Sequence, residues 1–270
     1  MEKRNPDSQV IVVTSGKGGV GKTTTVANIS TGLARLGYSV VVMDLDIGLK
    51  KLDLILGLEN RVIYDIIQVV EGECTLKQAL VKDKRFPELY MLPAAQTRNK
   101  DDISVEQVLA VVNDLRPDFD FIFIDCPAGI EQGFRNSIAA ADKAIVVTNP
   151  EVSAVRDADR IIGMLESADF HDIKLLVNRI RPDMVRHGDM LSIEDLVEHL
   201  CIELLGVVPE DSGVVISTNR GEPIILNDRS SAAQAFNNIV QRLVGNEVEF
   251  MTLQEDTFWS KLKRNLGFRK

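Results

Sequence analysis

The chain has 270 residues, of which 45% are hydrophobic and 26% charged, and its formal net charge is −9. This composition is ordinary for a globular protein, and the negative charge argues against a surface that coats nucleic acid. Three scattered cysteines indicate a reducing compartment rather than a disulfide framework. We expect no signal peptide in residues 1–9, and no apolar run reaches the ~20 residues of a membrane span.

From residue 10 onward, apolar runs alternate with stretches of helical spacing. In chain order we expect a strand at 10–13, a helix at 24–36, a strand at 39–44, a loop or short helix at 49–60, helices at 62–70 and 76–81, a strand at 89–92, a helix at 105–115, a strand at 121–125, a helix at 130–141, a strand at 144–148, a helix at 151–168, a strand at 173–177, a helix at 192–200, a strand at 204–208 and a helix at 231–244. This alternation predicts an α/β fold with a mainly parallel, doubly wound sheet flanked by helices.

Residues 16–23 read Gly-Lys-Gly-Gly-Val-Gly-Lys-Thr and match the phosphate-binding pattern G-x-x-x-x-G-K-[ST]. The match lies between a predicted strand and a predicted helix, where backbone amides and the helix dipole attract phosphate. In this pattern Lys22 reaches the β- and γ-phosphates, and the Thr23 hydroxyl holds Mg²⁺. We therefore predict an ATP and Mg²⁺ site in a P-loop NTPase, with nucleotide-binding residues Gly16, Lys17, Gly18, Gly19, Val20, Gly21, Lys22, Thr23 and Thr24.

Acidic residues stand at the ends of two further predicted strands. Asp44 and Asp46 follow the run at 40–43, and Asp125 follows the run at 121–124. Open α/β sheets bind ligands at the carboxyl ends of their strands. An aspartate that ends an apolar strand after a P-loop also fits the Walker B position, which supports the Mg²⁺ shell.

The charge and the spacing of apolar residues change near the end of the chain. We expect a polar extension at 1–9, an ATPase domain at 10–244, an acidic linker at 245–256 and an amphipathic helix at 257–270. This last stretch has five Lys or Arg residues and no acid. Its apolar residues Phe258, Trp259, Leu262 and Leu266 fall within a ~100° arc, which suits an interface with anionic lipid. Packing on the protein's own core or on a partner is the alternative for this helix.

Lys17 gives the loop a second lysine, and with it the loop resembles the deviant Walker A loop of the MinD/ParA family of ATPases. The resemblance covers nearly the whole chain and is strongest to the members that determine the septum site. The matching stretches are residues 14–24, Asp-Leu-Asp-Ile-Gly-Leu at 44–49, Asn-Pro-Glu-Val-Ser at 149–153, Val-Arg-Asp-Ala-Asp-Arg at 155–160, Arg-His-Gly-Asp-Met-Leu at 186–191 and the basic tail.

The resemblance implies Mg²⁺-dependent ATP hydrolysis in a homodimer. Lys17 would cross to the partner subunit's phosphates, Lys22 would hold its own, and Asp46 would position the attacking water. Thr23, Asp44 and Asp125 would support the metal. The base would lie between Asn178, which matches the position that reads the adenine edge, and a wall formed by Pro209, Glu210 and Asp211.

The resemblance also implies partners. The ATP-bound dimer would attach to an anionic membrane surface and recruit the division inhibitor MinC, and MinE would stimulate hydrolysis and release. Asp157 and Asp159 fall on the stretch that resembles the partner-binding face. The expected location is cytoplasmic and peripheral, on the inner face of a bacterial membrane or on the plastid inner envelope, and two tails on one dimer would raise avidity by ~10²–10⁴.

Three alternatives stay open on the sequence. A ParA-type DNA segregation ATPase would need a basic surface, and here basic excess occurs only in the apolar-faced tail. An electron-transfer protein like the nitrogenase iron protein would need cysteines at a shared cluster, and only Cys126 is near a matching position. A MinD-like regulator of flagellar number has similar motifs, and the sequence distinguishes it less clearly from a septum-site ATPase.

Overall fold

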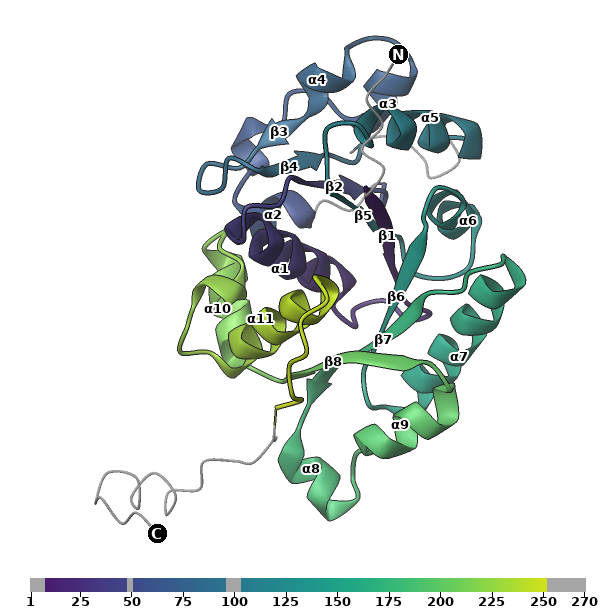
Figure 1. The fold of residues 1–270 in the computed structure, drawn as a ribbon, viewed down its shortest axis with the longest axis vertical. Coiled ribbons are helices and arrows are strands. Elements are labelled where there is room, and N and C mark those ends of the chain that lie inside the picture. Colours follow the sequence, from purple (N-terminus) through teal and green to yellow (C-terminus); the bar gives the residue numbers. More distant parts are fainter. Residues whose placement is uncertain (1–7, 48–50, 96–102, 252–270) are drawn as a thin grey trace.

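The computed structural model describes residues 8–47, 51–95 and 103–251. One eight-stranded sheet in the order β3-β4-β2-β5-β1-β6-β7-β8 runs through this part of the chain (Figure 1). Neighbouring strands are parallel except β3, which is antiparallel to β4. The strands are Gln9–Thr14 (β1), Val40–Asp44 (β2), Val81–Lys82 (β3), Leu89–Leu92 (β4), Phe121–Asp125 (β5), Lys143–Thr148 (β6), Ile173–Ile180 (β7) and Glu203–Pro209 (β8).

Helices cover both faces of this sheet (Figure 1). On one face lie Lys22–Arg35 (α1), Leu52–Leu56 (α2), Ser212–Asn219 (α10), the 3-10 turn Ile224–Leu226 (η3) and Ser231–Leu243 (α11). On the other lie Ile66–Val70 (α3), Leu76–Ala79 (α4), Val105–Leu115 (α5), Gln132–Ala139 (α6), Val152–Ser167 (α7), Pro182–His187 (α8) and Ile193–Leu200 (α9). The predicted doubly wound α/β class is confirmed.

The core consists of two apolar clusters, one on each face of the sheet. Along β1, Val10 and Val12 belong to one cluster, and Ile11 and Val13 belong to the other. Successive side chains of a strand point to opposite faces, so a strand covered on both sides must be apolar throughout. This requirement explains the unbroken hydrophobic runs in the sequence.

Side chains cap several of the helices, but not the one that follows the predicted phosphate loop. Ser192 and Asp195 form a capping box at the start of α9, and equivalent boxes begin α3, α4 and α5. By contrast, α1 follows Gly21 in the left-handed region, and no side chain caps it. The first amide groups of α1 therefore remain available to an anion.

Several expected boundaries were wrong. The helix expected at 62–70 begins at Ile66, because the Asp65 side chain caps it in a box with Gln68. The helix expected at 76–81 ends at Ala79, and its last expected residue, Val81, belongs to β3. The strand expected at 173–177 continues to Ile180, so Asn178 lies inside β7.

Other elements were not predicted at all. The edge strand β3, helices α8 and α10, and η3 have two to eight residues each. Such short segments give hardly more than one or two turns of periodicity, so the spacing of their apolar residues carries little signal. The stretch expected as a loop or short helix at 49–60 does contain α2, and it overlaps the 3-10 turn Glu59–Arg61 (η1). The predicted tail helix at 257–270 lies outside the described residues. Within the described ranges, no helix is long and apolar enough to cross a membrane.

Phe123 provides a test of the core. Its side chain is fully buried on β5, at the middle of the sheet. We expect Phe123→Ala to lower the free energy of unfolding by ~3–5 kcal/mol, measured by urea denaturation. Phe250→Ala is the matched control, because Phe250 is half exposed and packs on the Arg242 guanidinium, a contact that contributes ~1 kcal/mol. Equal losses in the two variants would contradict the assignment of the core.

Candidate nucleotide site

The P-loop joins β1 to α1 at the carboxyl edge of the sheet, as the sequence predicted. Lys22 is buried in the first turn of α1, and its Nζ donates a hydrogen bond to Ser15 Oγ at 2.9 Å. Burial lowers the pKa of Lys22, an effect partly offset by the nearby carboxylate of Asp125. The ammonium therefore lies near the carboxylate of Asp125, which ends the neighbouring strand β5.

Two glycines of the loop allow other elements to approach closely. A Cβ on Gly16 would lie 2.3 Å from the carbonyl oxygen of Asp157, so this glycine lets α7 pack against the loop. Gly21 has φ +104°, and a Cβ there would lie 2.3 Å from Asn178 Nδ2. That amide nitrogen donates to the carbonyl oxygen of Val20 at 2.7 Å. The loop is thus fixed from both sides by β7 and α7.

Two carboxylates lie side by side at the edge of the sheet. Asp44 of β2 and Asp125 of β5 are partners in the register of adjacent parallel strands, and both are buried. Burial and the neighbouring Asp125 raise the pKa of Asp44 well above its ordinary value. Burial also raises the pKa of Asp125 to about 7, although the Thr23 hydroxyl and Lys22 act in the opposite direction. Both carboxyl groups would be stabilised in their ionised form by a cation.

The residues present fit a magnesium ion. Asp125 Oδ1 is buried without a hydrogen-bond partner, and the Thr23 hydroxyl bonds to the same carboxyl group. Among the described residues, no group of three His, Cys, Asp or Glu side chains forms a self-contained metal site. Mg²⁺ typically uses one or two carboxylates together with phosphate oxygens and water, so the pair of acids and Thr23 suit this ion.

A cavity of about 260 Å³ opens over the P-loop. Gly18, Gly19, Gly21, Lys22, Thr23, Thr24 and Asp46 line it, all of them among the predicted site residues. The sequence analysis missed four further lining residues, namely Lys51, Ile55, Ala128 and Arg179. They come from three separate segments that only the fold brings together. The φ of +57° at Arg179, unusual for a residue with a side chain, has no signature in the sequence.

A second cavity of about 670 Å³ shares Gly21, Thr24 and Arg179 with the first. Asn178, Pro209, Glu210 and Asp211 line it, so the residues predicted around the base are together. The Asp211 carboxylate, however, is engaged in helix capping. It accepts hydrogen bonds from Gly213 N at the start of α10 and from the Ser230 hydroxyl before α11, at 2.7 and 2.6 Å. Its carboxylate is therefore already occupied by the two helix starts.

Lys17 lies outside this cavity, on the adjacent surface. Its ammonium donates to Glu151 Oε2 at 2.9 Å and to Ser153 Oγ at 3.2 Å, next to the start of α7. The Lys17 side chain is 41% exposed and that of Glu151 is 52% exposed. Lys17 therefore does not reach the P-loop cavity of its own chain in this arrangement.

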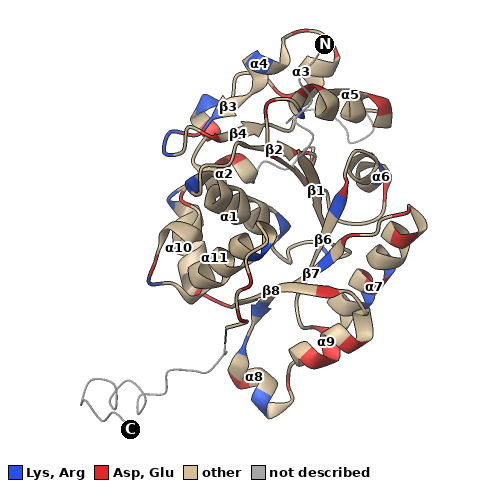
Figure 2. Cartoon of the chain, in the orientation of Figure 1, with Lys and Arg blue, Asp and Glu red and all other residues tan. Residues whose placement is uncertain are grey.

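The remaining predicted residues lie elsewhere. Asp157 and Asp159 are exposed on α7, a helix that has both acidic and basic residues (Figure 2). Phe258, Trp259, Leu262 and Leu266 lie outside the described residues. Cys126 is fully buried, and burial raises the pKa of its thiol to about 11, which disfavours the thiolate that an iron–sulfur cluster requires.

Known proteins with the same sequence pattern and fold identify the family. The family model described as an AAA domain matches residues 8–175. The septum site-determining protein MinD of Synechocystis sp. is 52% identical over 262 residues, which cover 96% of this chain and 98% of that protein. The chain belongs to the MinD family of septum site-determining proteins, within the MinD/ParA ATPases. The resemblance in the sequence is thereby confirmed.

Two solved structures of the MinD family agree with the fold. The MinC:MinD cell division protein complex of Aquifex aeolicus matches with a TM-score of 0.86 and 49% identity, over 91% of this chain and 99% of that chain. MinD of Pyrococcus horikoshii, solved with Mg-ADP, matches with a TM-score of 0.80 and 30% identity, over 88% and 96% of the two chains. These matches favour an ATPase of septum determination over the segregation and electron-transfer alternatives.

The buried carboxylates predict how stability depends on pH. The pKa of folded Asp125, about 7, lies above its ordinary value of 3.8, so folding favours the protonated carboxyl group. In the Mg²⁺- and nucleotide-free protein, the contribution of Asp125 to the free energy of unfolding should therefore be complete near pH 4 and be lost as the pH rises through about 7. Asp125→Asn should reduce the resulting fall in the free energy of unfolding by an amount on the order of a few kcal/mol, with Asp44 responsible for the remainder.

Urea denaturation between pH 4 and 8 measures this dependence. Asp114→Asn, which changes an exposed acid of α5, serves as the control and should leave the fall unchanged. If Asp125→Asn and Asp114→Asn had the same pH profile, the assignment of Asp125 as a buried, protonated group would be wrong.

Proposed function

We propose that the protein is an ATP-dependent, dimerising membrane switch in septum placement, which hydrolyses Mg-ATP to ADP and phosphate. One observation carries this proposal: the P-loop, the buried pair Asp44 and Asp125, and the surface lysine Lys17 all meet at one edge of the sheet. Membership of the MinD family and the Mg-ADP in the Pyrococcus relative support it.

Each group at this edge has a distinct role in the proposal. Lys22 and the amides of residues 16–24 hold the phosphates. Thr23, Asp44 and Asp125 hold Mg²⁺, which when bound neutralises charge on the phosphates. Asp46, at the wall of the phosphate cavity, orients the attacking water. The base lies between Asn178 and the wall of Pro209, Glu210 and Asp211.

Lys17 links hydrolysis to dimerisation. To reach a second subunit's phosphates it must leave Glu151 and Ser153. An exposed ion pair of this kind contributes only ~0–1 kcal/mol, so a phosphate can replace it readily. In the transition state the arriving ammonium would offset charge on the phosphate oxygens. Hydrolysis would then require the dimer.

The proposal includes two protein partners, MinC and MinE, and a membrane contact. The Aquifex complex supports MinC as a partner, and we place its contact at the exposed Asp157 and Asp159 of α7. Because Gly16 packs on the backbone of Asp157, the phosphate loop and this face form one packed unit. The family resemblance suggests MinE as the activator and the tail residues Phe258, Trp259, Leu262 and Leu266 as the membrane contact, so the protein would be peripheral on the inner membrane face.

The two P-loop lysines should have separable roles. Lys22→Ala should abolish binding of a fluorescent ADP analogue, because the buried ammonium faces the phosphates. Lys17→Ala should bind that analogue normally but fail to dimerise with ATP, as measured by sedimentation velocity, and should hydrolyse ATP ~10²–10³-fold more slowly. Lys77→Ala, at an exposed position on α4, is the control. A Lys17→Ala variant that dimerised normally would show that Lys17 has no role across the interface.

Membrane attachment should depend on the nucleotide. We expect the full chain to sediment with anionic vesicles in Mg-ATP and to stay in solution in Mg-ADP, because two tails on one dimer bind more strongly than one. Deletion of residues 257–270 should abolish sedimentation and leave nucleotide binding intact. A truncated protein that still sedimented would exclude the tail as the membrane contact. Retention on DNA without vesicle binding would favour a segregation ATPase.

A further inference from the structure

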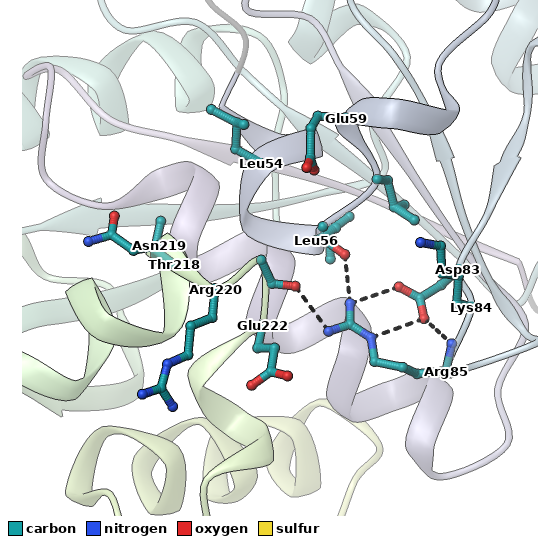
Figure 3. A pocket seen from close by; sticks show the side chains of 13 residues that line it. Leu54, Leu56, Glu59, Asp83, Lys84, Arg85, Thr218, Asn219, Arg220 and Glu222 are labelled. Carbon is teal, nitrogen blue, oxygen red and sulfur yellow. Dashed lines mark hydrogen bonds and ion pairs between the residues drawn. The ribbon is translucent and has the colours of Figure 1, made fainter.

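A cavity of about 500 Å³ lies away from the P-loop, where three segments distant in the sequence meet. Figure 3 shows its walls, which are the end of α2, the loop after β3 and the end of α10. Arg85, from the loop, reaches between the other two segments (Figure 3). The contacts of this one side chain connect α2 with α10.

Arg85 uses its guanidinium as a bridge. Nη2 donates to the carbonyl oxygen of Leu56, the last residue of α2, at 2.6 Å. Nη1 donates to the carbonyl oxygen of Gly221, just beyond α10, at 3.1 Å. Carbonyl groups at the end of a helix have no partner within the helix, so they are ready acceptors for such donors.

Asp83 holds this guanidinium in place. Its side chain is fully buried, and it accepts from Arg85 Nη2 at 3.0 Å and from Arg85 Nε at 3.3 Å. The same carboxylate accepts from the backbone N–H groups of Arg85 and Phe86 at 2.6 and 3.1 Å. A buried acid with this many donors fixes both the loop and the arginine, so the bridge has little freedom to rotate away.

The ends of the two helices also touch directly. Gly57 and Gly221 both have a left-handed backbone, with φ of +65° and +66°. A Cβ on Gly57 would lie 2.6 Å from Gly221 O, and one on Gly221 would lie 2.7 Å from the Gly57 Cα. The backbones therefore meet without a side chain between them, and Arg85 ties them at this point.

Each of these helices also borders one of the two cavities of the candidate nucleotide site. Lys51, just before α2, and Ile55 within it line the phosphate cavity together with Asp46. Asp211 caps α10, and Val215 of α10 lines the base cavity. Arg85 lines neither cavity. A movement of either helix on ligand binding would act on the other through their joined ends.

We propose that Arg85 is a positioning residue that couples the phosphate half of the site to the base half. With Asp83, Gly57 and Gly221 it forms a clamp that makes α2 and α10 move as one unit. The inference rests on the proposed function, because it assumes that the two cavities hold the two halves of one nucleotide. In this proposal Arg85, which lies outside the nucleotide site, helps the two halves of the site to bind ATP together.

Half-ligands test this coupling. Mg-pyrophosphate occupies only the phosphate half, so in the full chain it should slow amide hydrogen exchange in the P-loop and α2 and, through the clamp, in α10. Adenosine should likewise slow exchange in α2. Saturating adenosine should tighten binding of Mg-pyrophosphate about fivefold, within the usual range of allosteric coupling. Loss of this cross-protection in an Arg85 variant that still folds would distinguish coupling from a merely structural role.

Arg85→Lys is the variant of choice. Lysine keeps a charge for the buried Asp83, but a single ammonium cannot span both carbonyls and the carboxylate in the way a guanidinium fork does. We expect pyrophosphate to protect the P-loop and α2 of this variant but not α10, and the fivefold cooperation to disappear. Arg61→Lys is the matched control, because Arg61 donates to the carbonyl of Lys82 at the same edge of the sheet without touching α10.

Gly221→Ala is an independent second variant, since it separates the helix ends while Arg85 is intact. It should lose the cross-protection as well. Cross-protection that persists in both variants, or α10 that is unprotected in the unmodified chain while the P-loop is protected, would overturn the clamp alone. Failure of Mg-pyrophosphate to protect even the P-loop would overturn the proposed function together with the clamp.

Discussion

The structure depends on two acids that are buried side by side at one edge of the sheet, one of them near a buried lysine. Asp44 and Asp125 end adjacent strands in register, and neither is exposed to water that could solvate its charge. Two such carboxylates cannot both ionise there without a compensating cation. Burial raises the pKa of both groups, and the ammonium of Lys22 offsets only part of this effect at Asp125. In the proposed function, a metal-bound polyphosphate would supply that compensating cation.

Close backbone contacts at glycines join the candidate nucleotide site to the surrounding elements. Gly16 brings α7 against the phosphate loop, Gly21 admits the Asn178 amide, and Gly57 meets Gly221 behind the site. At each point a side chain would separate the elements. The nucleotide loop is therefore in direct contact with the α7 surface and with the end of β7, and a change at the loop has short physical routes to both.

Much of this could be predicted from the sequence, because the informative signals were local. The P-loop, the Asp125 strand end and the capping box at Ser192 each depend on residues close together in the chain, and the long apolar strands follow from burial on both faces. Arg179 and Arg85 could not be found in this way. Their positions depend on segments that meet only after folding, and neither stands in a pattern with a known spacing.

The measurement that tests the central claim most directly is calorimetric titration of the full chain with Mg-ADP at pH 7, in buffers of different ionisation enthalpy. If Asp44 and Asp125 share the metal site, binding must displace the protons that their raised pKa values hold, so the account predicts net proton release. Binding of Mg-ADP with no proton release, or with proton uptake, would contradict the assignment of these two carboxylates to the metal.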